Sequence, residues 1–260
     1  MSRVSVCSIA LRHLEAEAAF RVIAEAGFKK VDLLQRPPHF SLDPAECDPE
    51  KVAKAARTYG LQIANLGTYT GAGFESENPA EQEAALKLMY RAIDLAVFFG
   101  ARSIRVRAGN DDPACIERIV PWFKQSADYA AAHRVYMGIE NHGGAISGNP
   151  EVLTSLFGKV GSPYFGDLYE PYNLMSAGTE YHYALGVMRK HIVHAHFKLG
   201  KGKPGAMQLT MPEENEIDYP WVLSTLDKLG YTGDFALEYE YKGEPAETAL
   251  PKWYEAFKAL

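Results

Sequence analysis

The sequence predicts a (β/α)8 TIM barrel, because strand-like and helix-like segments alternate along the chain and polar side chains end its last four strand-like segments. Short apolar runs alternate with longer patterns of helical period, as in βα units around a parallel sheet. The length of 260 residues, with 47% hydrophobic content, is close to the ~250 residues typical of such a barrel. We therefore expect a single barrel domain over residues 1–260.

Eight segments have the length and apolar character of barrel strands, and a helical pattern follows each of them. Several helical patterns end in glycine, the residue type that most often closes an α-helix. The strands are expected at Val4–Ile9, Lys30–Leu34, Gln62–Leu66, Ser103–Arg107, Val135–Glu140, Tyr164–Tyr169, Ile192–Phe197 and Phe235–Tyr239. The longest irregular stretch, Gly200–Asp218, follows the seventh strand and is a candidate lid or oligomer contact.

Composition and charge argue against several classes of protein. The formal net charge of −6 leaves no basic surface for nucleic acid. No stretch approaches the ~20 apolar residues that cross a membrane, and the N-terminal segment does not resemble a signal peptide. The three cysteines show no CxxC spacing, so we expect reduced thiols. These features predict a cytoplasmic protein, and we expect a homo-oligomer of two or four chains.

The last four strand-like segments each end in a side chain that can bind a metal. These are Glu140 in GIENHGG, Glu170 in LYEPYNL, His196 in IVHAHFK and Glu238 in FALEYE. At the rim of a parallel barrel the side chains point toward one another, and three facing carboxylates repel unless a cation neutralises them. Carboxylate oxygens with one imidazole suit a divalent ion of the Mn, Mg, Co or Fe type. We predict one such ion, with Mn²⁺ as the first choice.

In this order the four motifs resemble those of the xylose isomerase-like TIM-barrel superfamily of sugar isomerases and epimerases. Members often carry a Glu before a polar pair after the fifth strand and a D-P-x-N or D-x-x-H element after the sixth. They then carry a V-H-x-H/K element on the seventh strand and a Glu in an I/L-E-Y-E run on the eighth. The resemblance covers essentially the whole chain. It implies that the metal ligands are Glu140, Glu170, His196 and Glu238.

Two of these ligands have competing neighbours. Glu170 stands where Asp is usual, and Asp167 precedes it by three residues. The Pro-x-Asn that follows matches Glu170, and strand alternation puts the two side chains on opposite faces, so Asp167 is the alternative. His194 shares a strand face with His196 but lies farther from the C-terminal rim. We expect His196 to be the ligand and His194 to be packed and hydrogen-bonded.

The resemblance also implies a reaction. Ketose epimerases and isomerases of this family bind the carbonyl oxygen and an adjacent hydroxyl of the sugar on the metal, which acidifies the proton between them and stabilises the enediolate. In the epimerases two carboxylates on opposite sides of the sugar exchange that proton, and Glu140 and Glu238 are the candidates. The alternatives are a lyase that dehydrates a keto-inositol or cleaves a 3-keto-glycoside, a non-catalytic barrel or subunit of a hetero-complex, and an endonuclease IV-type DNA-repair enzyme.

Further side chains are candidates for contact with the sugar substrate. His142 follows the Glu140 motif and resembles a substrate-hydroxyl ligand of the family. Tyr69 follows the third strand, where it could stack on a sugar, with packing inside the protein as the alternative. Lys198 lies two residues beyond His196 on the same strand face, so it either reaches the pocket or forms a buried salt bridge to a ligand carboxylate.

Two arginines on the fourth predicted strand are unusual, because barrel interiors are mostly filled by branched apolar side chains. An inward Arg105 or Arg107 needs an anion. We expect this anion to be a carboxylate of the protein. The alternative is an acidic group of the substrate, and Arg107 is our candidate to bind it. The basic loop KLGKGKPGA is a second candidate for binding phosphate, with simple solvation as the other reading.

Overall fold

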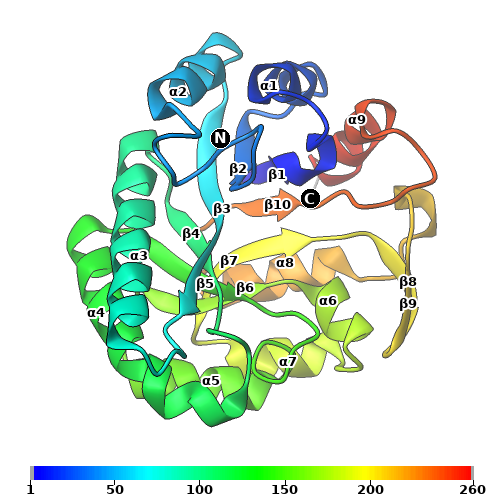
Figure 1. The fold of residues 1–260 in the computed structure, drawn as a ribbon. Coiled ribbons are helices and arrows are strands. Elements are labelled where there is room, and N and C mark those ends of the chain that lie inside the picture. Colours follow the sequence, from blue (N-terminus) through cyan, green and yellow to red (C-terminus); the bar gives the residue numbers. More distant parts are fainter. Residues whose placement is uncertain (1–2, 259–260) are drawn as a thin grey trace.

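The computed structural model describes residues 3–258, and in them eight parallel strands close into a barrel (Figure 1). The barrel strands are β1 (Val4–Cys7), β2 (Lys30–Leu34), β3 (Gln62–Gly73), β4 (Ser103–Val106), β5 (Tyr136–Glu140), β6 (Phe165–Tyr169), β7 (Ile192–Phe197) and β10 (Phe235–Leu237). Each strand lies beside its neighbour in this order, and β10 closes the barrel by pairing with β1, Val4 opposite Phe235. The predicted (β/α)8 barrel is confirmed.

A ring of helices covers the outside of the barrel (Figure 1). Many begin with proline after a capping side chain; Asp48 and Asn78, for example, each accept a hydrogen bond from an amide two residues on. The helices are α1 (Ala16–Glu25), α2 (Pro49–Thr58), α3 (Pro79–Phe99), α4 (Ile116–His133), α5 (Pro150–Val160), α6 (Pro171–Ser176), α7 (Tyr181–Met188), α8 (Tyr219–Lys228) and α9 (Ala246–Phe257), with 3-10 turns at Ser8–Leu11, Pro113–Cys115 and Pro212–Glu214. None of the helices within residues 3–258 is long and apolar enough to span a bilayer.

The outer face of β6 shows how the core is built between barrel and helices. Phe165 stacks on Phe123 of α4 with 4.6 Å between ring centroids, and the Tyr169 hydroxyl donates to the Tyr181 carbonyl of α7. Strand alternation places Asp167 on this same outer face. Its carboxyl group is fully buried, and neither oxygen has a hydrogen-bond partner. Burial, with a further contribution from Glu140, raises the pKa of Asp167 well above its usual range.

We expect Asp167→Asn to stabilise the protein at neutral pH by on the order of 1 kcal/mol. The raised pKa means that the folded state holds the proton, so this group contributes its full stability below pH ~4 and loses it as pH rises toward the folded pKa. Asparagine carries no charge at any of these pH values, so the variant does not lose this stability as pH rises. Urea unfolding from pH 4 to pH 8 should show wild-type stability declining relative to the variant. Parallel curves, or a variant less stable at pH 7, would contradict this reading.

Strand β3 continues to Gly73, so its expected end at Leu66 was wrong. The extension pairs with the end of β4, where the Arg107 amide donates to the Thr70 carbonyl (2.7 Å). Gly71 makes this close approach possible, since it has a φ of +98° and a Cβ there would lie 2.3 Å from the Arg107 carbonyl oxygen. The extension carries Tyr69 to the mouth of the barrel.

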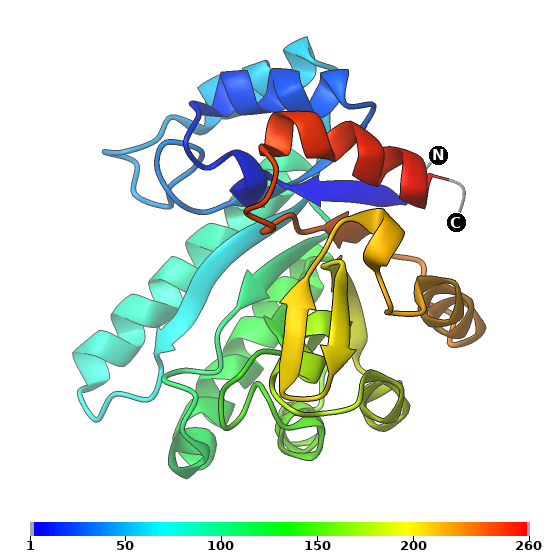
Figure 2. The ribbon, with the colours of Figure 1, turned by 90° about the vertical axis from the view of Figure 1, so that its right-hand side faces the viewer.

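The irregular stretch expected over Gly200–Asp218 instead contains an antiparallel hairpin, β8 (Gly200–Lys203) and β9 (Ala206–Leu209). Figure 2 shows this yellow hairpin standing beside the barrel. A backbone bond from the Gly205 amide to the Met175 carbonyl (2.7 Å) ties its turn to α6. Glycine, proline and lysine in KGKPGA favour a loop locally, and these tertiary contacts hold the strands.

Candidate metal centre and active site

Three of the four predicted ligands converge at the C-terminal mouth of the barrel. Glu140 ends β5, His196 lies near the end of β7, and Glu238 directly follows β10. The His196 Nδ1 atom is 3.1 Å from Glu140 Oε1 and 3.4 Å from Glu238 Oε2. One ligand atom from each residue lies within 4.8 Å of the others, and all three side chains are buried. Parallel strands that end at one rim produce this convergence from distant parts of the chain.

The Glu170 side chain at the end of β6 points its carboxyl group at the first turn of α6. Its two oxygens accept hydrogen bonds from the amides of Tyr172 (3.0 Å) and Asn173 (2.6 Å), so Glu170 caps this helix. Burial raises the pKa of Glu170 to about 8, Lys198 opposes the rise, and Glu238 reinforces it. Glu170 remains a predicted ligand. To bind an ion it would use lone pairs that the helix amides leave free, or exchange those amides for the ion.

Two cations neutralise the converging carboxylates. Arg105 Nη1 lies 3.2 Å from Glu140 Oε2, which confirms a protein carboxylate as its partner. Lys198 Nζ lies 3.4 Å from Glu238 Oε2 and 2.9 Å from Glu240 Oε2, so Lys198 forms the buried salt bridge. Burial opposes ionisation, but Arg105 lowers the pKa of Glu140 and Lys198 lowers that of Glu238. Both carboxyl groups are therefore ionised at neutral pH.

Asp32 on β2 contacts both His194 and His196. It was not identified as a site residue from the sequence. Its Oδ2 atom lies 2.8 Å from the Nε2 atoms of both His194 and His196, and its Oδ1 atom accepts from the Asn65 amide (2.7 Å). Burial opposes its ionisation, but the two histidines lower the pKa of Asp32. The expected hydrogen-bonded role of His194 is confirmed. An acid inside the apolar strand KVDLL was the available signal, because a buried carboxylate requires partners.

The donor set fits a divalent cation. Asp32 accepts the Nε2 proton of His196 and so leaves Nδ1 facing Glu140 and Glu238. The Glu238 Oε2 atom is buried and has no hydrogen-bond partner. An ion that replaced the Nδ1 proton would gain an imidazole nitrogen and two carboxylates, a combination typical of Mn, Fe, Co and Mg sites.

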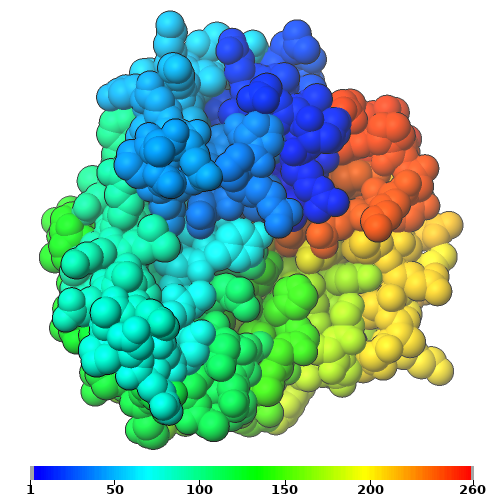
Figure 3. All heavy atoms as spheres, viewed as in Figure 1, coloured from blue at the N-terminus to red at the C-terminus, as the bar shows by residue number. Residues whose placement is uncertain are grey.

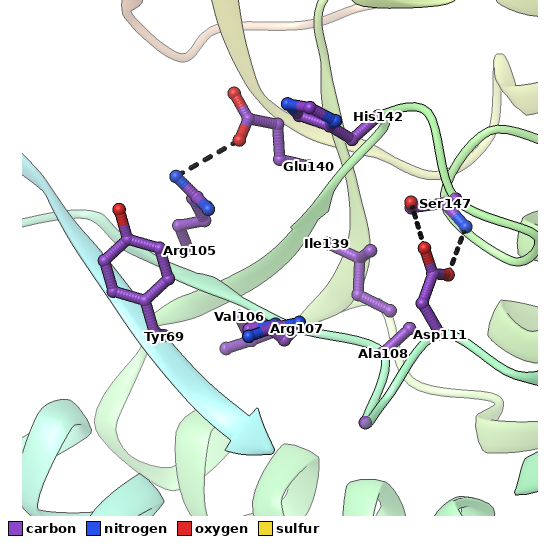
Figure 4. A pocket seen from close by; sticks show the side chains of 12 residues that line it. Tyr69, Arg105, Val106, Arg107, Ala108, Asp111, Ile139, Glu140, His142 and Ser147 are labelled. Carbon is purple, nitrogen blue, oxygen red and sulfur yellow. Dashed lines mark hydrogen bonds and ion pairs between the residues drawn. The ribbon is translucent and has the colours of Figure 1, made fainter. Parts of the chain in front are cut away.

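A cavity of about 250 Å³ opens beside Glu140, between the β3 extension and the loops after β4 and β5 (Figure 4). Figure 3 shows the same face as Figure 1, where these cyan and green segments meet at the surface. Arg105 lies between the Tyr69 ring, with its Cζ atom 4.6 Å from the ring centroid, and Glu140. His142 stands next to Glu140, and Arg107 lines the wall. Tyr69, His142 and Arg107 thus surround one space; Lys198 is not in its lining.

Residues 20–260 match the family described as xylose isomerase-like TIM barrel. The chain belongs to the xylose isomerase-like TIM-barrel family. Among curated proteins, this xylose isomerase-like chain is 26% identical over 211 residues to SgbU of Escherichia coli K12, which carries the name of an L-ribulose-5-phosphate 3-epimerase. That alignment covers 76% of this chain and 73% of SgbU.

Two solved structures illustrate how widely this xylose isomerase-like fold is shared. AsbF of Bacillus anthracis, described as a 3-DHS dehydratase of petrobactin synthesis, has a TM-score of 0.76 at 18% identity, with 98% of each chain covered. A xylose isomerase-like protein of Mycobacterium smegmatis in complex with magnesium has a TM-score of 0.78 at 16% identity, with 99% and 98% covered. At these identities the likeness concerns the fold.

Proposed function

We propose that this xylose isomerase-like protein is a divalent-metal-dependent isomerase or epimerase of a ketose or keto-sugar derivative. The observation that carries the proposal is the convergence of two ionised carboxylates, Glu140 and Glu238, on one imidazole nitrogen of His196 beside a cavity. The epimerase name of SgbU supports the same reaction class. We take residues 1–260 as one domain with this activity.

The ion would be held by Glu140, His196 and Glu238, with Glu170 as the fourth ligand. When bound, it would polarise the carbonyl of the substrate and so acidify the adjacent carbon-bound proton. Asp32 keeps the His196 ring oriented through its Nε2 proton. Mn²⁺ is our first choice, and Mg²⁺, Co²⁺ and Fe²⁺ suit the same donors.

The two carboxylates differ in position, and that difference suits an epimerase. Glu140 comes from β5 and Glu238 follows β10, with β6 and β7 between them in the barrel wall. One carboxylate can accept the carbon-bound proton from one side of the sugar while the other delivers a proton to the opposite side, which inverts the carbon. Return of the proton to the neighbouring carbon would give an isomer. Tyr69 and His142 are placed to contact the sugar in the cavity.

A panel of keto-sugars incubated in deuterated water with Mn-loaded protein, read by NMR, tests this proposal. We expect deuterium to enter one substrate next to its carbonyl without loss of a substituent. Elemental analysis should give about one divalent ion per chain, and chelation should lower the melting temperature, since the ion binds only the folded cluster. No bound metal and no thermal shift with Mn²⁺ would favour a non-catalytic barrel.

A lyase is the second candidate, and the dehydratase description of AsbF favours it. Both reactions begin by removing a proton next to a carbonyl, so the same residues serve either one. The NMR panel separates them. Loss of water from a keto-inositol, or of the aglycone from a 3-keto-glycoside, would identify a lyase.

A further inference from the structure

Arg107 is a cation without an acidic partner at the wall of the active-site cavity. It follows β4, its side chain is exposed, and it lines the cavity beside Glu140 (Figure 4). Its backbone amide is bound to the β3 extension, which fixes where the side chain begins. Within residues 3–258 no carboxylate forms an ion pair with the Arg107 guanidinium. Arg105, two residues earlier, differs because it is only partly exposed and is paired with Glu140.

The two acids of the cavity wall are already occupied by other partners. Glu140 is bound by Arg105 at 3.2 Å. The Asp111 oxygens accept from the amides of Ile146 (2.9 Å) and Ser147 (2.8 Å) and from the Ser147 hydroxyl (2.7 Å), as Figure 4 shows in part. Neither acid is available to Arg107. The cavity wall therefore presents the Arg107 guanidinium, unpaired in the described part of the chain, to a ligand, and the His142 imidazole lines the same cavity.

We infer that this wall binds an anionic group of the substrate, a carboxylate or a phosphate, through Arg107. This inference rests on the proposed function and names the substrate class of the same site. The planar guanidinium can donate two parallel hydrogen bonds to either oxyanion. About 250 Å³ lies just below the ~300–1,000 Å³ of ligand pockets in general, which suits a small sugar that carries one acidic group.

The basic hairpin is the competing place for an anion. Lys201 on β8 is already paired with Glu214 at 2.6 Å, and Lys203 is exposed. Neither residue lines the cavity beside Glu140. Lys203 is therefore a matched control for Arg107, because removing it changes the net charge of the protein by the same amount.

Isothermal titration calorimetry of the Mn-loaded full-length protein with two ligand pairs tests the inference. L-ribulose 5-phosphate against L-ribulose isolates a phosphate, and D-tagaturonate against D-tagatose isolates a carboxylate. We expect the wild type to prefer the anionic member of one pair, which identifies the group. Arg107→Ala should reduce that preference at least about tenfold, the usual effect of losing a charged hydrogen bond. Arg107→Lys should restore part of it, and Lys203→Ala should keep it.

Several outcomes would overturn the inference. These are equal affinities within both pairs for the wild type, an unchanged preference in Arg107→Ala, or an equal loss in Lys203→Ala. Melting curves of each variant exclude misfolding as the cause. Arg107→Lys repeats the test with a variant that keeps the positive charge and most of the aliphatic chain. The titration reads affinity rather than hydrogen exchange, so its result does not depend on deuterium entry. A protein that binds an anionic ligand through Arg107 but exchanges no hydrogen would refute only the proposed function.

Discussion

Glu238→Gln is expected to slow deuterium exchange into the substrate at least ~100-fold while part of the bound metal is retained. Glutamine keeps an oxygen for the ion but cannot accept a proton, and a positioned general base commonly contributes ~100-fold to 10,000-fold. Lys198, which lies 3.4 Å from the Glu238 carboxylate, would keep Glu240 as its partner at 2.9 Å. The same loss is expected for Glu140→Gln, where Arg105 loses its carboxylate.

Glu240→Gln is the matched control for this experiment. Glu240 also pairs with Lys198, but it stands outside the group formed by Glu140, His196 and Glu238. The control should exchange deuterium at close to the wild-type rate. Metal content by elemental analysis and exchange by NMR should be measured on the same samples. Near-normal exchange in Glu140→Gln or Glu238→Gln would show that the altered residue is not the base.

Glu170→Ala is expected to abolish metal binding, whereas Asp167→Asn should leave it largely intact. Asp167 lies on the outer face of β6 among the helices, whereas Glu170 caps α6 and feels the charges of Lys198 and Glu238. Loss of the cap should also cost about 1 kcal/mol of stability in the metal-free protein. Comparing melting temperatures with and without Mn²⁺ separates the two effects.

Glu170→Asp makes this second test sharper. Aspartate restores the usual family ligand and can still cap a helix, but its side chain is shorter by one methylene. Metal should bind, while turnover falls, since small misplacements at a reacting centre can cost on the order of 100-fold. Calorimetric metal titrations of the three variants decide the matter. Metal lost in Asp167→Asn and kept in Glu170→Ala would reverse the assignment.

The barrel and most of the site could be predicted because both depend on local pattern. Lys30–Leu34 and Ile192–Phe197 match β2 and β7 at both ends, since buried strands of a parallel barrel are apolar runs between polar helix ends. Val4–Ile9 and Phe235–Tyr239 were too long, because β1 turns into a 3-10 helix at Ser8 and the chain leaves the barrel after Leu237.

What could not be predicted depends on contacts between distant segments. The β3 extension exists because β4 lies beside Thr70, and the β8–β9 hairpin is held by Met175. Asp32 acquires its role only when the barrel brings it to His194 and His196, more than 160 positions later. The direction of the Glu170 carboxylate likewise follows from where α6 begins.

The capping bond of Glu170 connects the candidate metal centre to a surface feature. Glu170 holds the first turn of α6, and the Met175 carbonyl near the end of that helix holds the turn of the β8–β9 hairpin at Gly205. If an ion drew the carboxyl group away from these amides, the anchor of the hairpin would loosen. A molecule that bound the anchored hairpin more tightly than the loosened one would then weaken the binding of the ion by the same factor. Binding at the hairpin would thereby change the metal affinity of the site without any contact with the metal.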